Sequence, residues 1–299
     1  GFAMLTQILS HAASIHNAAT YAMRNTDWEF MAVYHDAIDH FCHGFMKYHP
    51  PQRKGIPDKP YQMFKDVVSS AYRFHDMMLE RLIQLAGPDT TVILMSDHGF
   101  HPDHLRPNKL PKEPAGPAYE HSPYGIFAMK GNNIQKDQRI YGATLLDITP
   151  TILTLFGLPV AKDMDGKVLV QSFEEPVQPE FIDSWEDVEG PAGMHPSDRR
   201  EDPWAAKEAM KQLVELGYID APGEDSQKNL EKITRESKYY LARVYMYKKH
   251  YEKAIELLEQ IFSEQAELRY GLALIRCYQA LRKVSEFRAT LDLVRKMDN

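Results

Sequence analysis

The segment 91–99 constrains the fold of this 299-residue chain more than any other. Its apolar, β-branched part, Thr91–Met95, is bounded by turn residues and predicts a short buried strand. Asp97 and His98 follow at the end of that strand, where an open α/β sheet places its chemistry. An adjacent carboxylate and imidazole suit zinc or a similar divalent cation. The segment therefore predicts an α/β domain with a pair of metal ligands at the sheet edge.

A second pair of the same residue types follows the apolar stretch 30–34, which is itself predicted to be a strand. Asp39 and His43 stand four residues apart, so one helical turn places both side chains on one face. Asp36 and His40 have the same spacing about one turn earlier and are the alternative pair.

Further histidines lie between the strand at 91–95 and a strand predicted over 125–129. His121 stands directly before a turn and that second strand. His101 and His104 occupy a Pro-rich loop over 101–118, which is typical of a segment that arches over a site. The residue pattern alone leaves the three histidines open as candidate ligands.

Taken in chain order, these segments resemble the metal core of the alkaline phosphatase superfamily, specifically its type I phosphodiesterase/nucleotide pyrophosphatase branch. The motif Ser-Asp-His-Gly at 96–99 is the family's own, and an Asp-x-x-x-His motif with a small residue before its His fits Asp39 and His43, with Cys42 as the small residue. The resemblance continues through 142–153 and 156–166, and covers about residues 1 to 170.

The resemblance implies a set of ligands for two divalent metal ions, with zinc favoured over manganese. Asp97 and His98 would hold one ion, and Asp39, His43 and the family's late histidine, best matched by His121, would hold the other. It implies two-metal phosphoryl transfer, in which one ion lowers the pKa of a nucleophile and the other activates water. The substrate would be a phosphodiester or phosphomonoester of a small molecule.

The same family also places an Asp and a Ser or Thr nucleophile before the Asp-x-x-x-His motif. No residue in such a setting precedes Asp39, so no catalytic nucleophile is assigned in this chain. We expect the chain to be the C-terminal part of the catalytic domain of a longer hydrolase. An inactive scaffold, or a sulfatase or phosphomutase of the same superfamily, are the alternative functions.

Composition limits the classes of partner that the chain is expected to bind. A net charge of −7 argues against nucleic acid, because binding to phosphates requires a basic face. No apolar run approaches the roughly 20 residues that a membrane span needs. Cys42 and Cys277 give no disulfide framework, which fits a reducing compartment, although the sequence leaves the compartment open.

Periodicity predicts the domain organisation. Helices are expected over 5–24, 61–86 and 150–156, and their alternation with strands predicts an α/β domain with a mostly parallel sheet over residues 1–172. An acidic, Pro-rich linker is expected over 173–203, with Phe181 and Trp185 as anchors on the first domain.

Residues 204–299 are predicted to be an all-α domain. After a helix over 205–216, the segment 239–262 resembles one tetratricopeptide repeat, with a weaker copy about 33 residues later. The packing positions expected are Leu241, Ala242, Tyr245, Tyr251, Ala254, Leu258 and Ile261 in the first repeat, and Tyr278, Val284, Leu291 and Val294 in the second. This domain is expected to pack on the first domain or recruit a protein partner, and to carry no chemistry.

Overall fold

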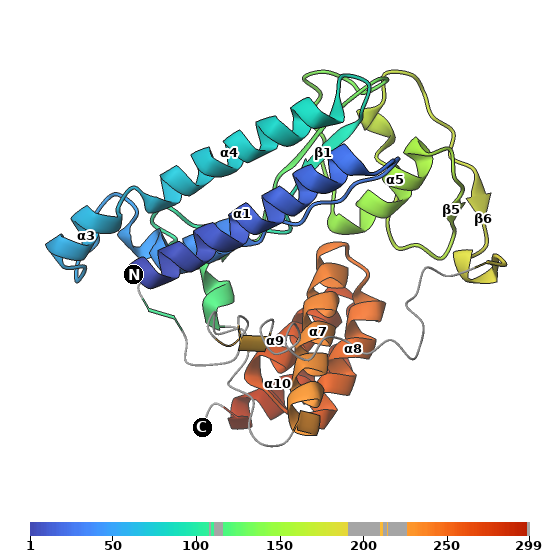
Figure 1. The fold of residues 1–299 in the computed structure, drawn as a ribbon. Helices are drawn as coiled ribbons and strands as arrows, with labels where there is room; N and C mark the ends of the chain where they lie inside the picture. The colour runs from blue at the N-terminus through green and yellow to red at the C-terminus, as the bar shows by residue number, and fades with distance from the viewer. Residues whose placement is uncertain (108, 111–115, 191–209, 212–213, 215–225, 298–299) are drawn as a thin grey trace. The chain divides into compact units, whose positions relative to one another are not determined.

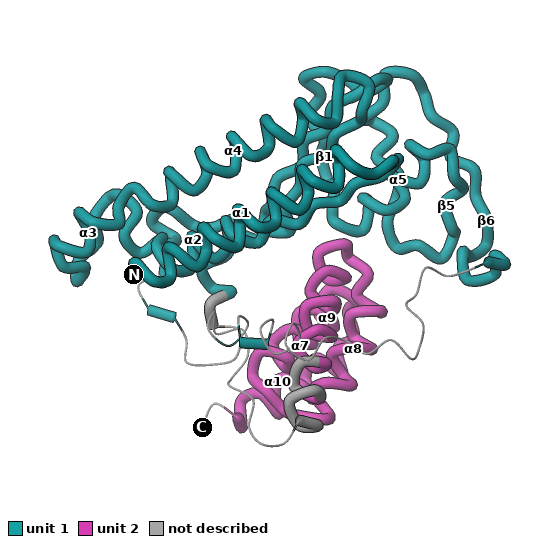
Figure 2. The backbone as a smooth tube through the Cα atoms, in the orientation of Figure 1, with its two compact units in different colours: residues 1–219 teal, residues 220–299 magenta. Residues whose placement is uncertain are grey.

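The structure is a computed structural model with two compact units, unit 1 (residues 1–219) and unit 2 (residues 220–299) (Figure 2). It describes all residues except 108, 111–115, 191–209, 212–213, 215–225 and 298–299. The predicted domain boundaries stay a prediction. Part of the expected linker, and most of the helix expected over 205–216, lie outside the described residues.

Unit 1 begins with a helical layer. Its elements are α1 (Phe2–Asn25), α2 (Ala37–Phe45), the 3-10 helix η1 (Met46–Tyr48), α3 (Asp58–Phe64) and α4 (Val67–Ala86). The helix predicted over 5–24 is confirmed as α1. The helix predicted over 61–86 is two helices, because Lys65 and Asp66 form a turn in which Asp66 takes the N-cap position of α4. Figure 1 shows α1 and α4 side by side, and α2 contacts both.

The core of this layer explains how α2 is oriented. Phe41, Cys42 and Phe45 are buried against α1 and α4, where Ala12 and Ala71 allow close helix packing. With the apolar residues on the inner face, the helical period leaves Asp39 and His43 on the other face of α2.

Short strands follow. The described residues contain three two-stranded sheets: β1 (Val92–Met95) with β4 (Phe127–Lys130), β2 (Gly99–Phe100) with β3 (His121–Ser122), and β5 (Val160–Ala161) with β6 (Phe181–Ile182). The first two pairs are antiparallel and the third is parallel. A strand forms at 92–95 as predicted, but it is not buried, since Leu94 and Met95 are 37% and 39% exposed; the strand predicted over 125–129 begins two residues later.

The mostly parallel sheet predicted for this domain is not confirmed. A parallel pair needs a crossover that returns the chain to the starting end, usually through an α-helix. Between β1 and β4 the described chain instead forms β2, the 3-10 helix η2 (Gly116–Glu120) and β3, and it pairs antiparallel on return. The stretch 30–34 was also predicted to be a strand but pairs with no strand in the described part; Phe30 packs edge-on against Phe156.

After β4 the chain forms the helix α5 (Ile148–Leu155), which confirms the helix predicted over 150–156. The 3-10 helix η3 (Leu145–Asp147) leads into it, and Asp147 accepts hydrogen bonds from the backbone N–H groups of Thr144 (2.8 Å) and Lys167 (2.9 Å). The 3-10 helix η4 (Val170–Ser172) precedes the acidic segment.

The acidic segment after residue 172 belongs to unit 1, and both predicted anchors lie where it contacts earlier residues of that unit. β6 pairs with β5, and the indole N–H of Trp185 in the 3-10 helix η5 (Trp185–Asp187) donates to the Pro159 carbonyl at 3.1 Å. The Phe181 ring itself is 58% exposed, so Phe181 contributes through its backbone.

Unit 2 is helical in its described residues. It contains α7 (Ser226–Tyr247), α8 (Tyr251–Glu264), α9 (Leu268–Ala280) and α10 (Val284–Met297), and each helix packs on the next. Ala242, Ala254, Leu258 and Ile261 are buried as predicted. At Gly271 an added Cβ would lie 2.4 Å from Val294 Cγ2, so α9 and α10 approach closely there.

Two predicted packing residues of unit 2 are wrong. Leu241 is 40% exposed because its neighbour Ala242, about 100° away around the helix, takes the inner position. Val284 is 58% exposed at the start of α10. No described helix of either unit is long and apolar enough to span a membrane.

Candidate metal centre

The first pair of site residues comes from α2. The Nε2 atom of His43 lies 3.3 Å from Asp39 Oδ1, across one helical turn. The His43 side chain is 5% exposed, and its ring packs edge-on against Phe100 with centroids 4.9 Å apart. The helix and the neighbouring strand β2 therefore fix the direction of this imidazole.

The Ser-Asp-His-Gly segment connects β1 to β2. Ser96 holds it in place, because its Oγ accepts from the Ile126 N–H at 3.0 Å and donates to the His98 carbonyl at 3.1 Å. Gly125 permits this approach, since an added Cβ would lie 2.0 Å from the Ser96 carbonyl oxygen. His98 Nδ1 is 3.1 Å from the Gly99 carbonyl, which can only accept. The proton of neutral His98 therefore sits on Nδ1, and its Nε2 carries the lone pair that can bind a metal ion.

The third part of the site is His121, which lies on β3. His121 is paired with Phe100 in the β2–β3 ladder, and its ring stacks on that of His98 with centroids 3.6 Å apart and an interplanar angle of 11°. The ladder thus places the late histidine beside the Ser-Asp-His-Gly segment.

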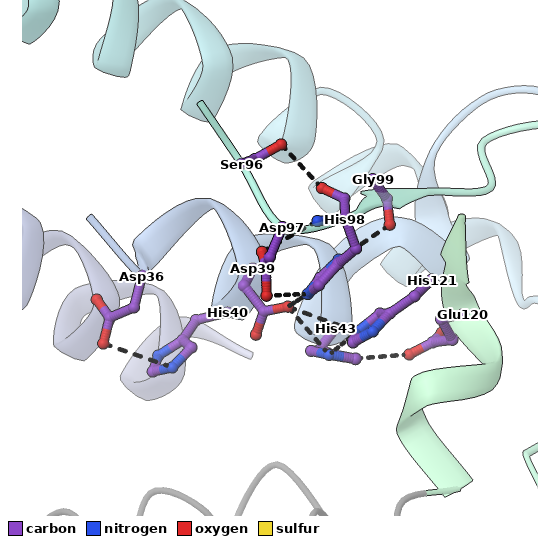
Figure 3. A network of polar contacts seen from close by, with 10 residues as sticks. All are labelled: Asp36, Asp39, His40, His43, Ser96, Asp97, His98, Gly99, Glu120 and His121. Carbon is purple, nitrogen blue, oxygen red and sulfur yellow. Dashed lines mark hydrogen bonds and ion pairs between the residues drawn. The ribbon is translucent and has the colours of Figure 1, made fainter. Parts of the chain in front are cut away.

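Three histidine nitrogens converge on one carboxylate oxygen (Figure 3). Asp39 Oδ1 lies 3.3 Å from Nε2 of His43 and 3.6 Å from Nε2 of both His98 and His121. The Nε2 atoms of His43 and His121 are 3.0 Å apart. Asp39, His43 and His121 each offer a ligand atom, all within 4.8 Å of one another.

These donor atoms fit a divalent cation. Two imidazole nitrogens 3.0 Å apart cannot both direct lone pairs at each other unless a proton or a cation lies between them. Asp39 Oδ1 is buried and accepts no hydrogen bond from the described residues, a costly arrangement that a cation would relieve. One carboxylate and two imidazoles are also a ligand set of catalytic zinc sites.

Protonation is the alternative to a cation. Burial disfavours the imidazolium form of His43, but the Asp39 and Glu120 carboxylates outweigh burial and raise the pKa of His43 to about 9. Burial likewise opposes ionisation of Asp39, and the three histidines, His43 first, overcome it and lower the pKa of Asp39. A cation therefore competes with a proton, so metal affinity should fall in acid.

Asp97 lies at the exposed edge of the cluster. Its side chain is 68% exposed, its Oδ1 accepts the His98 backbone N–H at 3.0 Å, and its Oδ2 lies 3.8 Å from His98 Nε2. The structure thus places the two predicted ligand pairs next to each other, with His98 between Asp97 and Asp39. Their roles as metal ligands stay a prediction.

The alternative residues do not join the three-ligand group. Asp36 and His40 lie 3.9 Å apart, and Figure 3 places them away from the cluster. His104 is 83% exposed and lies 3.9 Å from Asp103. Among the described residues, neither His104 nor His101 belongs to a group able to hold a metal.

No role was predicted for Glu120, which the structure places against the cluster. Its Oε2 lies 2.9 Å from His43 Nδ1, and its side chain is 13% exposed. An acidic residue directly before His121 was the available signal, but no local spacing links it to a helix residue 77 positions earlier.

Comparison with known proteins agrees with the geometry. Residues 5–111 match the family model of type I phosphodiesterase / nucleotide pyrophosphatase. The match supports the resemblance to this branch of the alkaline phosphatase superfamily, and it suggests a hydrolase. The matched segment contains the predicted ligand pairs on α2 and after β1, and it ends before η2. The helices of unit 2 lie outside the matched segment. Neither the curated proteins nor the solved structures compared with the chain gave a match.

Proposed function

We propose that this chain carries the cation-binding part of a metal-dependent phosphodiesterase or related phosphohydrolase. The observation that supports it most is the convergence of Asp39, His43 and His121 from α2 and β3, because α2 lies within the segment that matches the phosphodiesterase family model. The Asp39 carboxylate there faces imidazole nitrogens from three separate segments of the chain, His43 on α2, His98 after β1 and His121 on β3.

Two divalent cations are proposed, with zinc as the first candidate and manganese as the second. Asp39, His43 and His121 would hold one, and Asp97 with His98 would contribute to the other. When bound, the cations supply positive charge next to the transferring phosphoryl group.

The chain's own side chains have distinct tasks in this proposal. The stacked rings of His98 and His121, with Phe100 against His121 at 4.9 Å, form an aromatic wall along one side of the cluster, which would hold both imidazoles in place. His43 must lose its extra proton before it can act as a ligand, so activity should rise with pH. The substrate is proposed to be a phosphodiester or phosphomonoester of a small molecule.

Unit 2 is proposed to carry no chemistry and to act by packing or by recruiting a protein partner. Within its described residues there is no group of three His, Cys, Asp or Glu side chains placed to hold a metal. Its helix pairs are proposed to be tetratricopeptide repeats.

A matched pair of substitutions on α2 tests the catalytic proposal. The protein as its gene encodes it is assayed with bis(p-nitrophenyl) phosphate after chelation and after return of zinc or manganese. Chelation should abolish turnover and zinc should restore it. Asp39→Asn should lower turnover at least about 100-fold, because it removes a ligand charge, whereas Asp36→Asn should stay within about twofold. Turnover that survives chelation, or equal activity of Asp39→Asn and the parent protein, contradicts the proposal.

A further inference from the structure

Glu120 contacts the outer nitrogen of His43. It is the last residue of η2, and its Oε2 lies 2.9 Å from His43 Nδ1, with both side chains largely buried. An ionised carboxylate can only accept, so the Nδ1–H of His43 donates to Glu120. In Figure 3 this contact lies on the side of the imidazole opposite Asp39.

The contact determines which nitrogen of His43 is available to a ligand. With the proton of neutral His43 on Nδ1, the lone pair is on Nε2, which lies 3.3 Å from Asp39 Oδ1 and 3.0 Å from His121 Nε2. Without an acceptor at Nδ1, the proton of neutral His43 could move to Nε2 and block that atom as a ligand.

Glu120 is held in place by contacts that do not involve His43. Its carbonyl oxygen accepts from the His101 N–H at 3.1 Å, and the next residue belongs to the β2–β3 ladder. The buried guanidinium of Arg106 is close enough to interact with the Glu120 charge, and it donates to the carbonyls of Met46 and His49, directly after α2. The backbone of Glu120 is therefore held beside β3, and its charge lies within electrostatic range of an arginine that is anchored after α2.

We propose that Glu120 is a positioning residue of the cation site, which keeps neutral His43 in the Nδ1–H tautomer and directs Nε2 toward Asp39 and His121. The proposal rests on the proposed function, because it takes a cation at this cluster as given. Carboxylates that accept from the outer N–H of a metal-bound histidine orient the ring and raise its basicity.

Two substitutions separate the hydrogen bond from the charge. Glu120→Gln keeps an oxygen that can accept from Nδ1–H but removes the charge, and Glu120→Ala removes both. Asp36→Asn is the matched control, since it neutralises the carboxylate of a histidine pair on the same helix outside the cluster. Zinc affinity is measured by competition with a chelator, and the His43 tautomer by ¹⁵N NMR of the zinc-free and zinc-loaded chain.

Glu120→Ala should weaken zinc binding by about 10–100-fold and give a mixed His43 tautomer in the zinc-free protein above the His43 pKa. Glu120→Gln should keep the Nδ1–H tautomer but weaken zinc binding by about three- to tenfold, because the charge is lost, whereas Asp36→Asn should stay within about twofold. A thermal melt by circular dichroism checks that each variant folds. If Glu120→Ala does not fold, the same comparison between Glu120→Gln and Asp36→Asn decides.

The outcomes separate the inference from the proposed function. If the parent protein binds zinc at this cluster and both Glu120 variants bind it equally well with His43 unchanged, Glu120 has no positioning role and the proposed function stands. If the parent protein binds no zinc at the cluster, the proposed function fails, and the inference fails with it.

Discussion

Each of the two units buries a polar cluster. The two clusters differ in whether their buried polar atoms have hydrogen-bond partners within the cluster. In unit 2, Arg269 donates to Glu236 through both terminal nitrogens, one of them at 2.8 Å, and to Glu267 at 2.7 Å. The Tyr270 hydroxyl also contacts Glu236 at 3.3 Å. In unit 1, Asp39 Oδ1 faces three imidazoles and accepts no hydrogen bond from the described residues.

Such a difference is expected between a structural network and a cation-binding site. The guanidinium of Arg269 lies over the rings of Tyr239 and Tyr270, and hydrogen bonds to Glu236 and Glu267 overcome burial and raise its pKa, so it stays charged. Such a network links α7 to α9 and needs no further ligand. The cluster around Asp39 has more acceptors than donors and therefore requires a proton or a cation.

The largest expected effect is the loss of zinc affinity when a candidate ligand is removed from the cluster of unit 1. His121→Ala should weaken zinc binding by at least about 1,000-fold, or about 4 kcal/mol. The binding free energy of a protein zinc site, about 10–16 kcal/mol, comes from only a few ligands, so the loss of one has a large effect. His104→Ala removes an exposed histidine of the same loop and is the control, with no expected change. Calorimetric titration of zinc into each variant provides the measurement. Equal affinities for the two variants would show that the late ligand has been misassigned.

The next effect concerns unit 2. Arg269→Met should lower the free energy of unfolding of this unit by about 3 kcal/mol, because it leaves Glu236 buried and unpaired. The double variant Glu236→Leu/Arg269→Met should lose less than Arg269→Met alone, since no charge is left uncompensated. Urea unfolding followed by circular dichroism measures both. Zinc affinity should not change in either variant, and a tenfold change would contradict the separation of the two clusters.

The smallest effect is the pH dependence of the zinc-free protein. The folded pKa of His43, about 9, lies above its ordinary value of 6.5, so the folded state binds this proton more tightly than the unfolded state. This contribution is fully present below pH 6.5 and is lost as the pH rises through about 9.

The unfolding free energy of zinc-free protein, measured from pH 6 to 10, checks this prediction, with His43→Gln as the variant that should lack the alkaline loss. His35 provides an internal contrast. Burial, and then the charges of His75 and His16, lower the pKa of His35, so its contribution is present above pH 6.5 and lost as the pH falls. An alkaline loss of equal size in His43→Gln would contradict the coupling of His43 to its carboxylates.

Sequence predicted the parts of the site that depend on local geometry. The spacing of Asp39 and His43 requires only a helix, and the placement of Asp97 and His98 requires only the end of a strand. The convergence of these pairs with His121 followed from the resemblance, because it depends on the β2–β3 ladder between short strands.

Features that depend on the path of the chain in three dimensions could not be predicted in this way. The contact of Glu120 with His43 requires the end of η2 to lie beside α2, and no periodicity in the sequence indicates that neighbourhood. The antiparallel pairing of β1 with β4 depends on how the chain returns between those two strands. Within α7, Leu241 and Ala242 are equally compatible with the repeat pattern, and only packing against α8 decides which one is buried.

The most direct test of the cation site is anomalous diffraction at the zinc edge from crystals grown with zinc. We expect an anomalous peak about 2.0–2.2 Å from an Asp39 carboxylate oxygen and from Nε2 of both His43 and His121. A zinc ion bound instead by Asp36 and His40, or a folded chain with no peak between α2 and β3, would contradict it.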